Sequence, residues 1–437
     1  MTAITIGLIV TAIMVLMLFL GLPLGVTFFF TSALGLVWIG GFPTLLNQFS
    51  GGIFTLSASY SFAVIPLFLV VGILAGDTGI AGGAYKSART WFGKTRGGLL
   101  YTTIVANTLF GAVSGVPAAG NVVFSKIAYP ELKKNGYDSG TSLACICSAG
   151  ALSALIPPSM SILMFCILAE ISIGDALMAG TSGGILLTIV LCITVWIVSK
   201  VFPSKIPQVR PEDANYTFID KLKSLELLLP LLIVFAFIIG GSFAGWFPAT
   251  VGGAVAVVVL LLYAIFKRLP LKVIANGIWE GTHDFAGLYL MILGGQLFGR
   301  FITISGIPTA LVNWISGLDV PGLVVYTIIV VFYLFCGCLM DCMSILIITI
   351  PIIFPLLRSV GFNDFIICIA LVFLANVGGI TPPVGMSVFQ TASVTGESTG
   401  VIFRGLLPFF IAFIVCIFLI AVFPDSILWL LKILGGS

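Results

Sequence analysis

Long apolar runs separated by short polar segments follow one another from the start of this chain to its end. Most of the runs approach the roughly 20 residues that an α-helix needs to cross the hydrocarbon core of a bilayer. The longest polar stretch covers only about 199–224, which leaves no room for a large soluble domain. The pattern therefore predicts an all-α polytopic membrane protein.

Ten membrane crossings are expected, and two of them are broken. The unbroken ones are 3–20, 22–40, 57–76, 180–199, 225–243, 250–266, 284–304 and 405–423. The segments 140–172 and 365–395 are too long for one straight span, and each contains a Pro-Pro pair. Because proline lacks a backbone N–H and clashes with the preceding turn, each segment is expected to form two half-helices joined by an extended link.

The two halves of the chain share one pattern. "YPELKKNGYD" at 129–138 and "FPLLRSVGFND" at 354–364 both read aromatic-Pro-x-Leu-basic-x-x-Gly-aromatic. The shift in numbering that aligns these two motifs also aligns Pro157 with Pro382, the first proline of each Pro-Pro pair. We call this shift the repeat offset, and it predicts two related repeats joined by a linker. The repeats are 1–199 and 224–437, and the linker is 200–223.

The distribution of basic residues indicates that the repeats are inverted. Region 86–138 carries seven Lys or Arg residues, whereas the matching region 314–364 carries only Arg358. Basic loops mark the cytoplasmic side of a membrane protein. Corresponding segments of the two repeats are therefore expected to face opposite sides, with the linker in the cytoplasm.

A re-entrant hairpin is expected ahead of each broken segment. Basic residues flank 98–130 on both sides, so this run must enter the membrane and return on the cytoplasmic side. Its middle, "GAVSGVPAAG" at 111–120, has the composition of a turn. The counterpart is 322–355, with its break at "CGCLMD", residues 336–341. An ordinary span in place of the first hairpin is the alternative interpretation.

These breaks are candidate binding sites. Non-helical backbone at membrane depth is tolerated where it is buried in protein or lines a wet cavity. Freed carbonyls suit a small hard cation such as Na⁺, and helix N-termini suit carboxylates. The alternative is that the prolines only kink helices for packing, but two matched Pro-Pro pairs, each after a glycine-broken hairpin, favour an ion and substrate site.

Three polar side chains extend these candidate sites. Asp341 lies at the second hairpin break, where its carboxylate could coordinate a cation or accept hydrogen bonds from exposed backbone amides. Asn376 precedes the second Pro-Pro pair and could supply a side-chain oxygen. Arg300 is expected near the outer end of its span, where it could bind a substrate carboxylate or extend to the lipid headgroups.

Composition narrows the function further. The chain is 59% hydrophobic and 8% charged, with a mean hydropathy of +1.23 and a net charge of +3, and shows no basic stripe for nucleic acid. Its nine cysteines lie mostly in apolar segments, and its one histidine argues against a transition-metal site. No enzyme motif and no ATP-binding loop is present, so we expect no catalysis and no cofactor, and a Na⁺ or H⁺ gradient as the energy source.

Several segments resemble the large membrane subunit of the TRAP (tripartite ATP-independent periplasmic) transporters, and the similarity runs over essentially the whole chain. They are "AVIPLFLVVGILAGDTGIAGGA" (63–84), "FGAVSGVPAAG" (110–120), "YPELKKNGY" (129–137), "IPPSM" (156–160) and "TPPVG" (381–385). The resemblance implies an ion-transporter-type fold of two inverted repeats, in which a mobile domain moves against a scaffold as an elevator. It also implies Na⁺-coupled uptake of organic anions, such as dicarboxylates, keto acids, sialic acid or sugar acids, across a bacterial inner membrane. The implied partners are a small four-helix membrane subunit and a periplasmic substrate-binding protein.

The resemblance also points to individual positions, because the hairpin breaks and the Pro-Pro links line the cation sites of the family. The implied Na⁺ and substrate positions are Ser114, Gly115, Pro157 and Pro158 in the first repeat, and Gly337, Asp341, Thr381, Pro382 and Gly385 in the second. One departure concerns Val116 and Pro117, which stand where the family has two small or hydroxyl-bearing residues. This departure puts hydroxyl contacts from these two positions in question.

Two other functions stay open on the sequence alone. One is a stand-alone Na⁺/dicarboxylate symporter that needs no binding protein. The other is a channel-like membrane subunit without coupling to an ion gradient. The sequence does not name the substrate, and it does not decide between Na⁺ and H⁺ as the coupling ion.

Overall fold

A computed structural model describes residues 2–433 apart from 59, 208–215, 242–245, 248, 319, 339 and 384, and these residues form helices and connecting segments but no strand. The helices of the first half are α1 (Ala3–Phe19), α2 (Leu24–Ser57), α3 (Tyr60–Asp77), α4 (Ile80–Phe92), α5 (Gly98–Ser114), α6 (Pro117–Lys134), α7 (Ser139–Gly150), the 3₁₀ turn η1 (Ala151–Ala154), α8 (Met160–Ala169) and α9 (Ile173–Val201). Those of the second half are α10 (Phe218–Ser224), η3 (Leu225–Leu228), α11 (Leu229–Phe235), η4 (Ala236–Gly240), α13 (Ala249–Phe266), α14 (Leu271–Ser305), α15 (Ile307–Ser316), α16 (Gly322–Gly337), α17 (Cys342–Ser359), α18 (Asp364–Gly378), α19 (Met386–Thr395), α20 (Thr399–Val422) and α21 (Asp425–Ile433).

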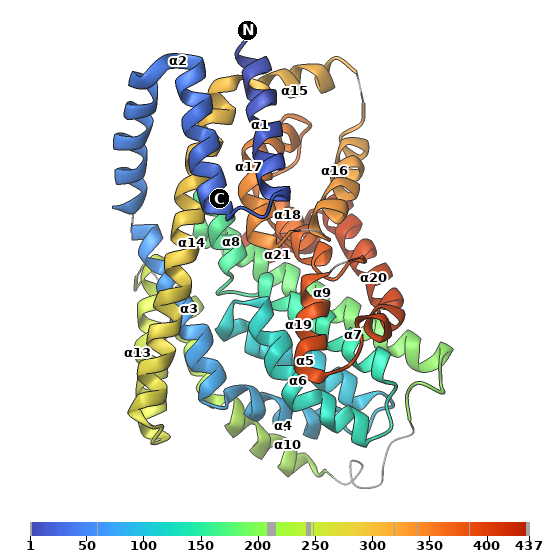
Figure 1. The fold of residues 1–437 in the computed structure, drawn as a ribbon. Coiled ribbons are helices and arrows are strands. Elements are labelled where there is room, and N and C mark those ends of the chain that lie inside the picture. The colour runs from blue at the N-terminus through green and yellow to red at the C-terminus, as the bar shows by residue number, and fades with distance from the viewer. Residues whose placement is uncertain are drawn as a thin grey trace.

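Five helices form a group along one side of the molecule (Figure 1). We call α1, α2, α3, α13 and α14 the outer group. Within it α14 packs on both α2 and α3, α13 packs on α3, and α1 packs on α2. Helices α5 to α9 and α16 to α20 make up the inner group, which contains both hairpins and both broken segments.

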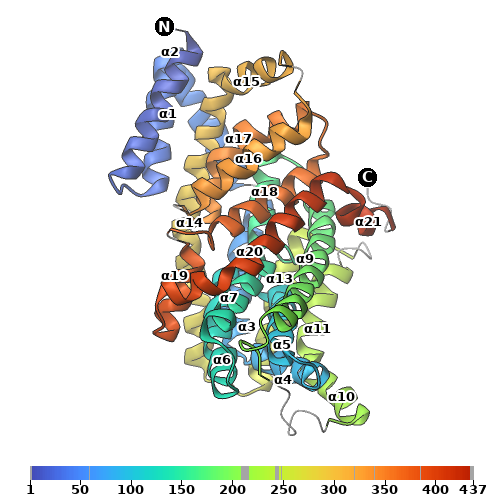
Figure 2. The same ribbon diagram turned by 90° about the vertical axis from the view of Figure 1, so that its right-hand side faces the viewer.

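In the inner group, helices of the first half have counterparts in the second half at the positions that the repeat offset predicts. The repeat offset converts Pro117–Lys134, the bounds of α6, into 342–359, the bounds of α17. The peptide bonds Pro157–Pro158 and Pro382–Pro383 are both cis. The α5–α6 hairpin lies in the lower half of the molecule and the α16–α17 hairpin in the upper half, in two views at right angles (Figures 1 and 2). Helices related by the offset therefore lie toward opposite ends.

Some expected spans differ from the helices observed. The expected span 284–304 is only the last part of α14, which begins at Leu271. The span expected at 22–40 continues as α2 to Ser57 through a kink at Gly41, and the span expected at 225–243 is divided among η3, α11 and η4. Hydropathy detects only the apolar part of a helix, whereas backbone hydrogen bonding continues through polar residues at the same pitch.

Five of the described helices are long and apolar enough to cross a membrane, and six are if the bent pair α3–α4 counts as one span. The broken segments do not pass this test, because each half is shorter than the bilayer core. The total of ten crossings therefore stays a prediction.

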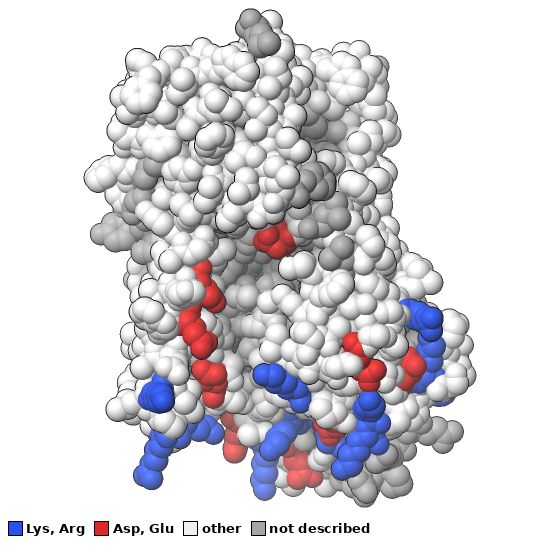
Figure 3. Space-filling model, viewed as in Figure 1, with Lys and Arg blue, Asp and Glu red and all other residues white. Residues whose placement is uncertain are grey.

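Two amphipathic helices, α4 and α15, were not expected from the sequence. Their bounds, Ile80–Phe92 and Ile307–Ser316, overlap once the repeat offset is applied, and they lie at opposite ends of the molecule (Figure 1). Amphipathic helices of this kind suit a membrane–water interface. Lys and Arg gather at the lower end of the face shown in Figure 3 and are missing from its upper half, which favours the lower end as the cytoplasmic one.

The two halves of the chain are connected at the lower end by a hydrogen-bonded cluster around Glu397, in the turn between α19 and α20. Its Oε1 accepts from Lys133 Nζ at 2.7 Å and from Tyr129 Oη at 2.5 Å, both on α6. The hydrogen bond from the Lys133 ammonium group lowers the pKa of the Glu397 carboxyl. This cluster ties the returning helix of the first hairpin to the second repeat.

Candidate functional site

The first hairpin turns at Gly115. This residue has φ +63°, a conformation that glycine adopts without strain, and its N–H donates to Gly111 O at 3.0 Å to close α5. Val116 is extended, and Pro117 opens α6 at the position where a missing N–H costs nothing. The sequence "SGVP" therefore encodes both the end of one half-helix and the start of the next.

The first broken segment passes directly against this turn. After α7 the chain tightens into η1 and then runs through Pro157 and Pro158 to Ser159, whose hydroxyl caps α8 by accepting from Ile162 N at 3.2 Å. Met160 N donates to Gly115 O at 3.3 Å. A β-carbon on Gly115 would lie 1.7 Å from Pro158 O, so the backbone of the hairpin touches the Pro-Pro link.

Ser114 lies at the last position of α5, beside this contact. Its side chain is fully buried, and its Oγ has no hydrogen-bond partner among the described residues. A buried hydroxyl without a partner is unfavourable by about 1–3 kcal/mol, which indicates that it meets a ligand or water. The structure thus brings Ser114, Gly115, Pro157 and Pro158 together in one enclosed place.

The second hairpin break is organised by Asp341, the N-cap of α17. Asp341 Oδ2 accepts from Met343 N at 3.0 Å and from Ser344 N at 3.2 Å, and its Oδ1 accepts from the Ser344 hydroxyl. Of the two roles expected for this carboxylate, the hydrogen bonds to exposed backbone amides are observed, and its role at a cation stays a prediction. Leu339, within the expected break, lies outside the described residues.

Glycines bring the second hairpin against the second broken segment. A β-carbon on Gly337 would lie 2.5 Å from the α-carbon of Gly378, so α16 and α18 approach backbone to backbone. Beyond α18, the Thr381 hydroxyl donates to Val377 O at 2.8 Å. Gly385, with φ +62°, would place a β-carbon 3.3 Å from Thr381 O. Pro382 is exposed, so the second link is open where the first is enclosed.

The two breaks meet through Cys342, the first residue of α17. Cys342 Sγ lies 3.5 Å from the hydroxyl of Ser161 on α8 and accepts from Asn376 Nδ2 at 3.2 Å. Asn376 is 7% exposed and also donates to Val372 O at 2.7 Å. The start of α8, which follows the first Pro-Pro pair, is thereby joined to the second hairpin and to α18.

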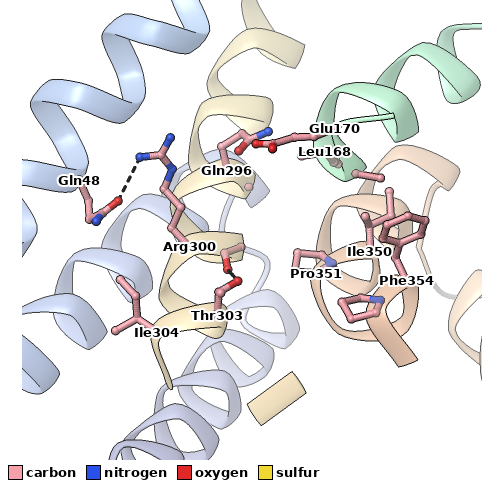
Figure 4. A pocket seen from close by; sticks show the side chains of 14 residues that line it. Gln48, Leu168, Glu170, Gln296, Arg300, Thr303, Ile304, Ile350, Pro351 and Phe354 are labelled. Carbon is pink, nitrogen blue, oxygen red and sulfur yellow. Dashed lines mark hydrogen bonds between the residues drawn. The ribbon is translucent and has the colours of Figure 1, made fainter. Parts of the chain in front are cut away.

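Arg300 lies in a different cavity, of about 510 Å³, between the outer helices α2 and α14 and the inner helices α8 and α17 (Figure 4). Its Nη1 donates to Gln48 Oε1 at 3.0 Å. Gln296, one turn earlier on α14, donates to Ile167 O at 3.4 Å, and Glu170 lines the cavity from the end of α8. None of the residues lining this cavity belongs to the hairpin breaks. The structure therefore separates Arg300 from the other predicted site residues.

Comparison with known proteins assigns a family to this arrangement. Residues 11–426 match the family model "Tripartite ATP-independent periplasmic transporter, DctM component". The chain belongs to this family. It is a multi-pass membrane protein and a TRAP large permease by family membership, and the resemblance of its motifs is confirmed.

Relatives of different specificity are similar over nearly their whole length. The C4-dicarboxylate TRAP transporter large permease protein DctM of Pseudomonas aeruginosa is 28% identical, over 90% of this chain and 92% of the relative. The sialic acid TRAP transporter large permease protein SiaM of Vibrio cholerae is 25% identical, with 96% and 97% covered. The ectoine TRAP transporter large permease protein TeaC of Halomonas elongata is 26% identical, with 97% and 98% covered.

A solved structure shares the fold. The YdaH transporter of Alcanivorax borkumensis superposes with a TM-score of 0.61 at 14% sequence identity, covering 89% of this chain and 90% of that one. At this identity the likeness concerns the fold alone.

A second cavity, of about 700 Å³, brings together charged residues that the sequence analysis did not connect. It extends from Val116 at the first hairpin turn, between α3, α6 and α14, to a group of charged side chains. These are Asp77, Lys126, Glu280 and Asp284. The sequence did carry a signal, because Asp77 and Glu280 each stand within or beside an apolar segment, but only the packing of α3 against α14 brings their helices together.

Proposed function

We propose that this chain is the large membrane subunit of a Na⁺-coupled importer of small organic anions in a bacterial inner membrane. A periplasmic binding protein delivers the substrate, and a small four-helix membrane subunit completes the complex. The inner group moves against the outer group as an elevator, carrying ion and substrate at the hairpin breaks.

The observation that carries this proposal is the junction of the two breaks. Gly115 touches the first Pro-Pro link, and Cys342 connects that link's helix to the second hairpin and to Asn376. Half-helix ends converge there, which is the arrangement that lets one site bind a cation and an anion together. The proposed Na⁺ ligands come from the Ser114, Pro157, Gly337 and Thr381 regions.

In the proposed elevator, the inner group moves against the outer group where glycines of α3 and α14 contact the two hairpins. Gly72 on α3 would place a β-carbon 2.8 Å from Ser114 O, and Gly295 on α14 would place one 2.1 Å from Cγ2 of Ile347 on α17. Glycines at these contacts let the outer helices approach each hairpin closely, so the proposed movement takes place across a closely packed interface.

The partial positive charge of helix N-termini and the substrates in the relatives' names support an organic-anion substrate. Dicarboxylate, sialic acid and ectoine, which the relatives' names give as their substrates, all carry a carboxylate. In this chain the N-termini of α6, α8, α17 and α19 lie at the breaks and favour an anionic group. Arg300 in the separate cavity is proposed as an earlier contact for the same carboxylate.

The decisive experiment is uptake into proteoliposomes. The chain is reconstituted with its small subunit, a panel of radiolabelled organic acids is offered with and without the binding protein, and the imposed gradient is Na⁺, H⁺ or none. We expect uptake only with an inward Na⁺ gradient and a loaded binding protein.

Each alternative gives a different result. Uptake without any binding protein would identify a stand-alone symporter. Equal fluxes with and without a gradient would identify a channel-like subunit. Uptake driven by a pH gradient and indifferent to Na⁺ would overturn Na⁺ coupling.

A further inference from the structure

A second group of buried polar side chains lies inside the first hairpin, away from its turn. Asn107 on α5, Asn121 on α6 and Ser153 in η1 are each 0% exposed. Neither the oxygen nor the nitrogen of either carboxamide, nor the Ser153 hydroxyl, has a hydrogen-bond partner among the described residues. Three buried oxygens and two buried amide nitrogens without partners are unfavourable in a packed interior, which indicates that the oxygens meet an ion or water and the nitrogens water.

Three glycines make the room that these side chains occupy. The position of a β-carbon on Gly120 is 2.6 Å from Asn107 Oδ1 and 3.4 Å from Ser153 Oγ, so both atoms border one point. A β-carbon on Gly111 would lie 2.7 Å from Ser153 Oγ, and one on Gly150 would lie 1.9 Å from Asn121 Oδ1. Alanine at any of these positions would collide with one of these polar side chains, which lie where α5, α6, η1 and the end of α7 pack together. We call this place the hairpin chamber.

The chamber differs in position from the site proposed for transport. Asn107 is seven residues ahead of Ser114 on α5, which corresponds to about 10 Å along the helix axis. Asn121 meets the chain at Gly150, the last residue of α7. The carboxyl end of a helix carries partial negative charge and favours a cation beside it.

The available ligand atoms define the class of ligand. Two carboxamide oxygens and one hydroxyl are hard, neutral oxygen donors, as are the backbone carbonyls at the end of α7. Divalent cations are normally bound with one or more carboxylates, and the three residues supply none. Soft metals need sulfur or imidazole. Neutral oxygens in a small buried space suit a monovalent cation of the size of Na⁺.

We propose that Asn107, Asn121 and Ser153 form a buried monovalent-cation site within the first hairpin, distinct from the transport site at its turn. A bound cation satisfies the orphaned oxygens and holds α5, α6 and η1 in one arrangement. The proposal does not depend on the transport function, because binding is measured without substrate, binding protein or gradient.

The test is the thermal stability of the purified full-length chain in lipid nanodiscs, titrated with NaCl, KCl or choline chloride at constant ionic strength. We expect Asn107→Ala to lose part of the Na⁺-dependent rise in Tm. Asn107→Asp places a carboxylate in the chamber, so we expect it to be less stable in choline, to recover in Na⁺, and to lower the Na⁺ concentration for half-maximal stabilisation by about tenfold.

Matched variants keep the result interpretable. Ser153→Ala is compared with Ser182→Ala, since Ser182 is equally buried but lies on α9 and donates to Met178 O at 3.4 Å. Only Ser153→Ala should reduce the Na⁺ effect, and this pair decides the matter if the Asn107 variants do not fold. If Asn107→Asp is equally unstable in Na⁺ and choline, or Ser153→Ala keeps the full Na⁺ effect, the chamber holds water and the proposal is overturned.

Discussion

At the scale of single residues, the first site depends on a position where nothing larger than glycine fits. Gly115 combines φ +63° with a β-carbon position 1.7 Å from Pro158 O. The sequence pointed to a turn somewhere in 111–120, because glycine, alanine and proline accumulate there. It did not show that the turn would touch the Pro-Pro link, since that contact joins segments that all of α6 and α7 separate in the chain.

We expect Gly115→Ala to lower stability by more than the strain of an alanine at positive φ, because its β-carbon would also collide with Pro158 O. Gly136→Ala is the matched control, because Gly136 has φ +79° but no atom within 4 Å of its β-carbon position. We expect the control to lose about 1–2 kcal/mol of stability and to transport normally. Gly115→Ala should lose more stability and nearly all Na⁺-driven uptake, measured in the same proteoliposomes. Equal losses from the two variants would contradict the assigned contact.

Two substitutions of Asp341 can separate the helix-capping role of its side chain from the effect of its negative charge. Asparagine caps a helix about as well as aspartate, whereas alanine costs about 1 kcal/mol. We expect Asp341→Asn to unfold at the wild-type temperature but to need more Na⁺ for half-maximal uptake, because the negative charge beside the site is gone. Asp341→Ala should show both defects. An unchanged Na⁺ dependence in Asp341→Asn would restrict this carboxylate to its capping role.

At the scale of elements, the hairpins and broken segments follow from local chemistry. Proline and glycine weaken a helix most where they cluster, and the expected breaks at 111–120 and at the Pro-Pro pairs coincide with observed helix ends. Local chemistry did not predict the extent of α14 or the existence of α4 and α15. These helices carry polar residues that hydropathy counts as loop, and their helical state depends on packing against other elements.

We expect uptake to require the first Pro-Pro link because this link contacts the hairpin turn. A proline without such a contact should not be required. Replacing Pro157 and Pro158 together by alanine allows η1 and α8 to join as one helix, which would withdraw Pro158 O from Gly115. We expect Na⁺-driven uptake to fall at least about tenfold, or about 1.4 kcal/mol in transition-state terms. Pro130→Ala is the control, since Pro130 is an exposed proline inside α6. It should leave uptake unchanged, and a similar loss from Pro130→Ala would contradict this interpretation.

At the scale of the whole molecule, the outer and inner groups meet through glycines on α3 and α14. This division combines α1 to α3 of the first half with α13 and α14 of the second. The repeat offset identifies which helices correspond but says nothing about which of them pack together. The assembly of one group from both halves is therefore a property of the tertiary structure.

A disulfide across the two groups should stop the elevator. Cysteines at Gly295 and Ile347 would have β-carbons about 3.4 Å apart, close to the spacing in disulfides. We expect oxidation to abolish uptake by this double variant and a reducing agent to restore it. The control pair is Leu67 with Gly253, at 3.2 Å but entirely within the outer group. If the cross-linked 295–347 pair still transports, these two helices do not move past each other.

The sequence by itself indicated a helical membrane protein with a pattern repeated in its two halves, and it located the breaks in the first hairpin and at the Pro-Pro pairs. Apolar length, basic residues, glycine and proline act through the chain's immediate surroundings and the bilayer, so their effects can be read in order along the sequence. Only the tertiary structure decided which breaks meet, that Arg300 lies in a separate cavity, and that Asn107, Asn121 and Ser153 are buried without a partner among the described residues. Those facts depend on contacts between distant segments, because burial without a partner is a property of the packed interior and not of any residue alone.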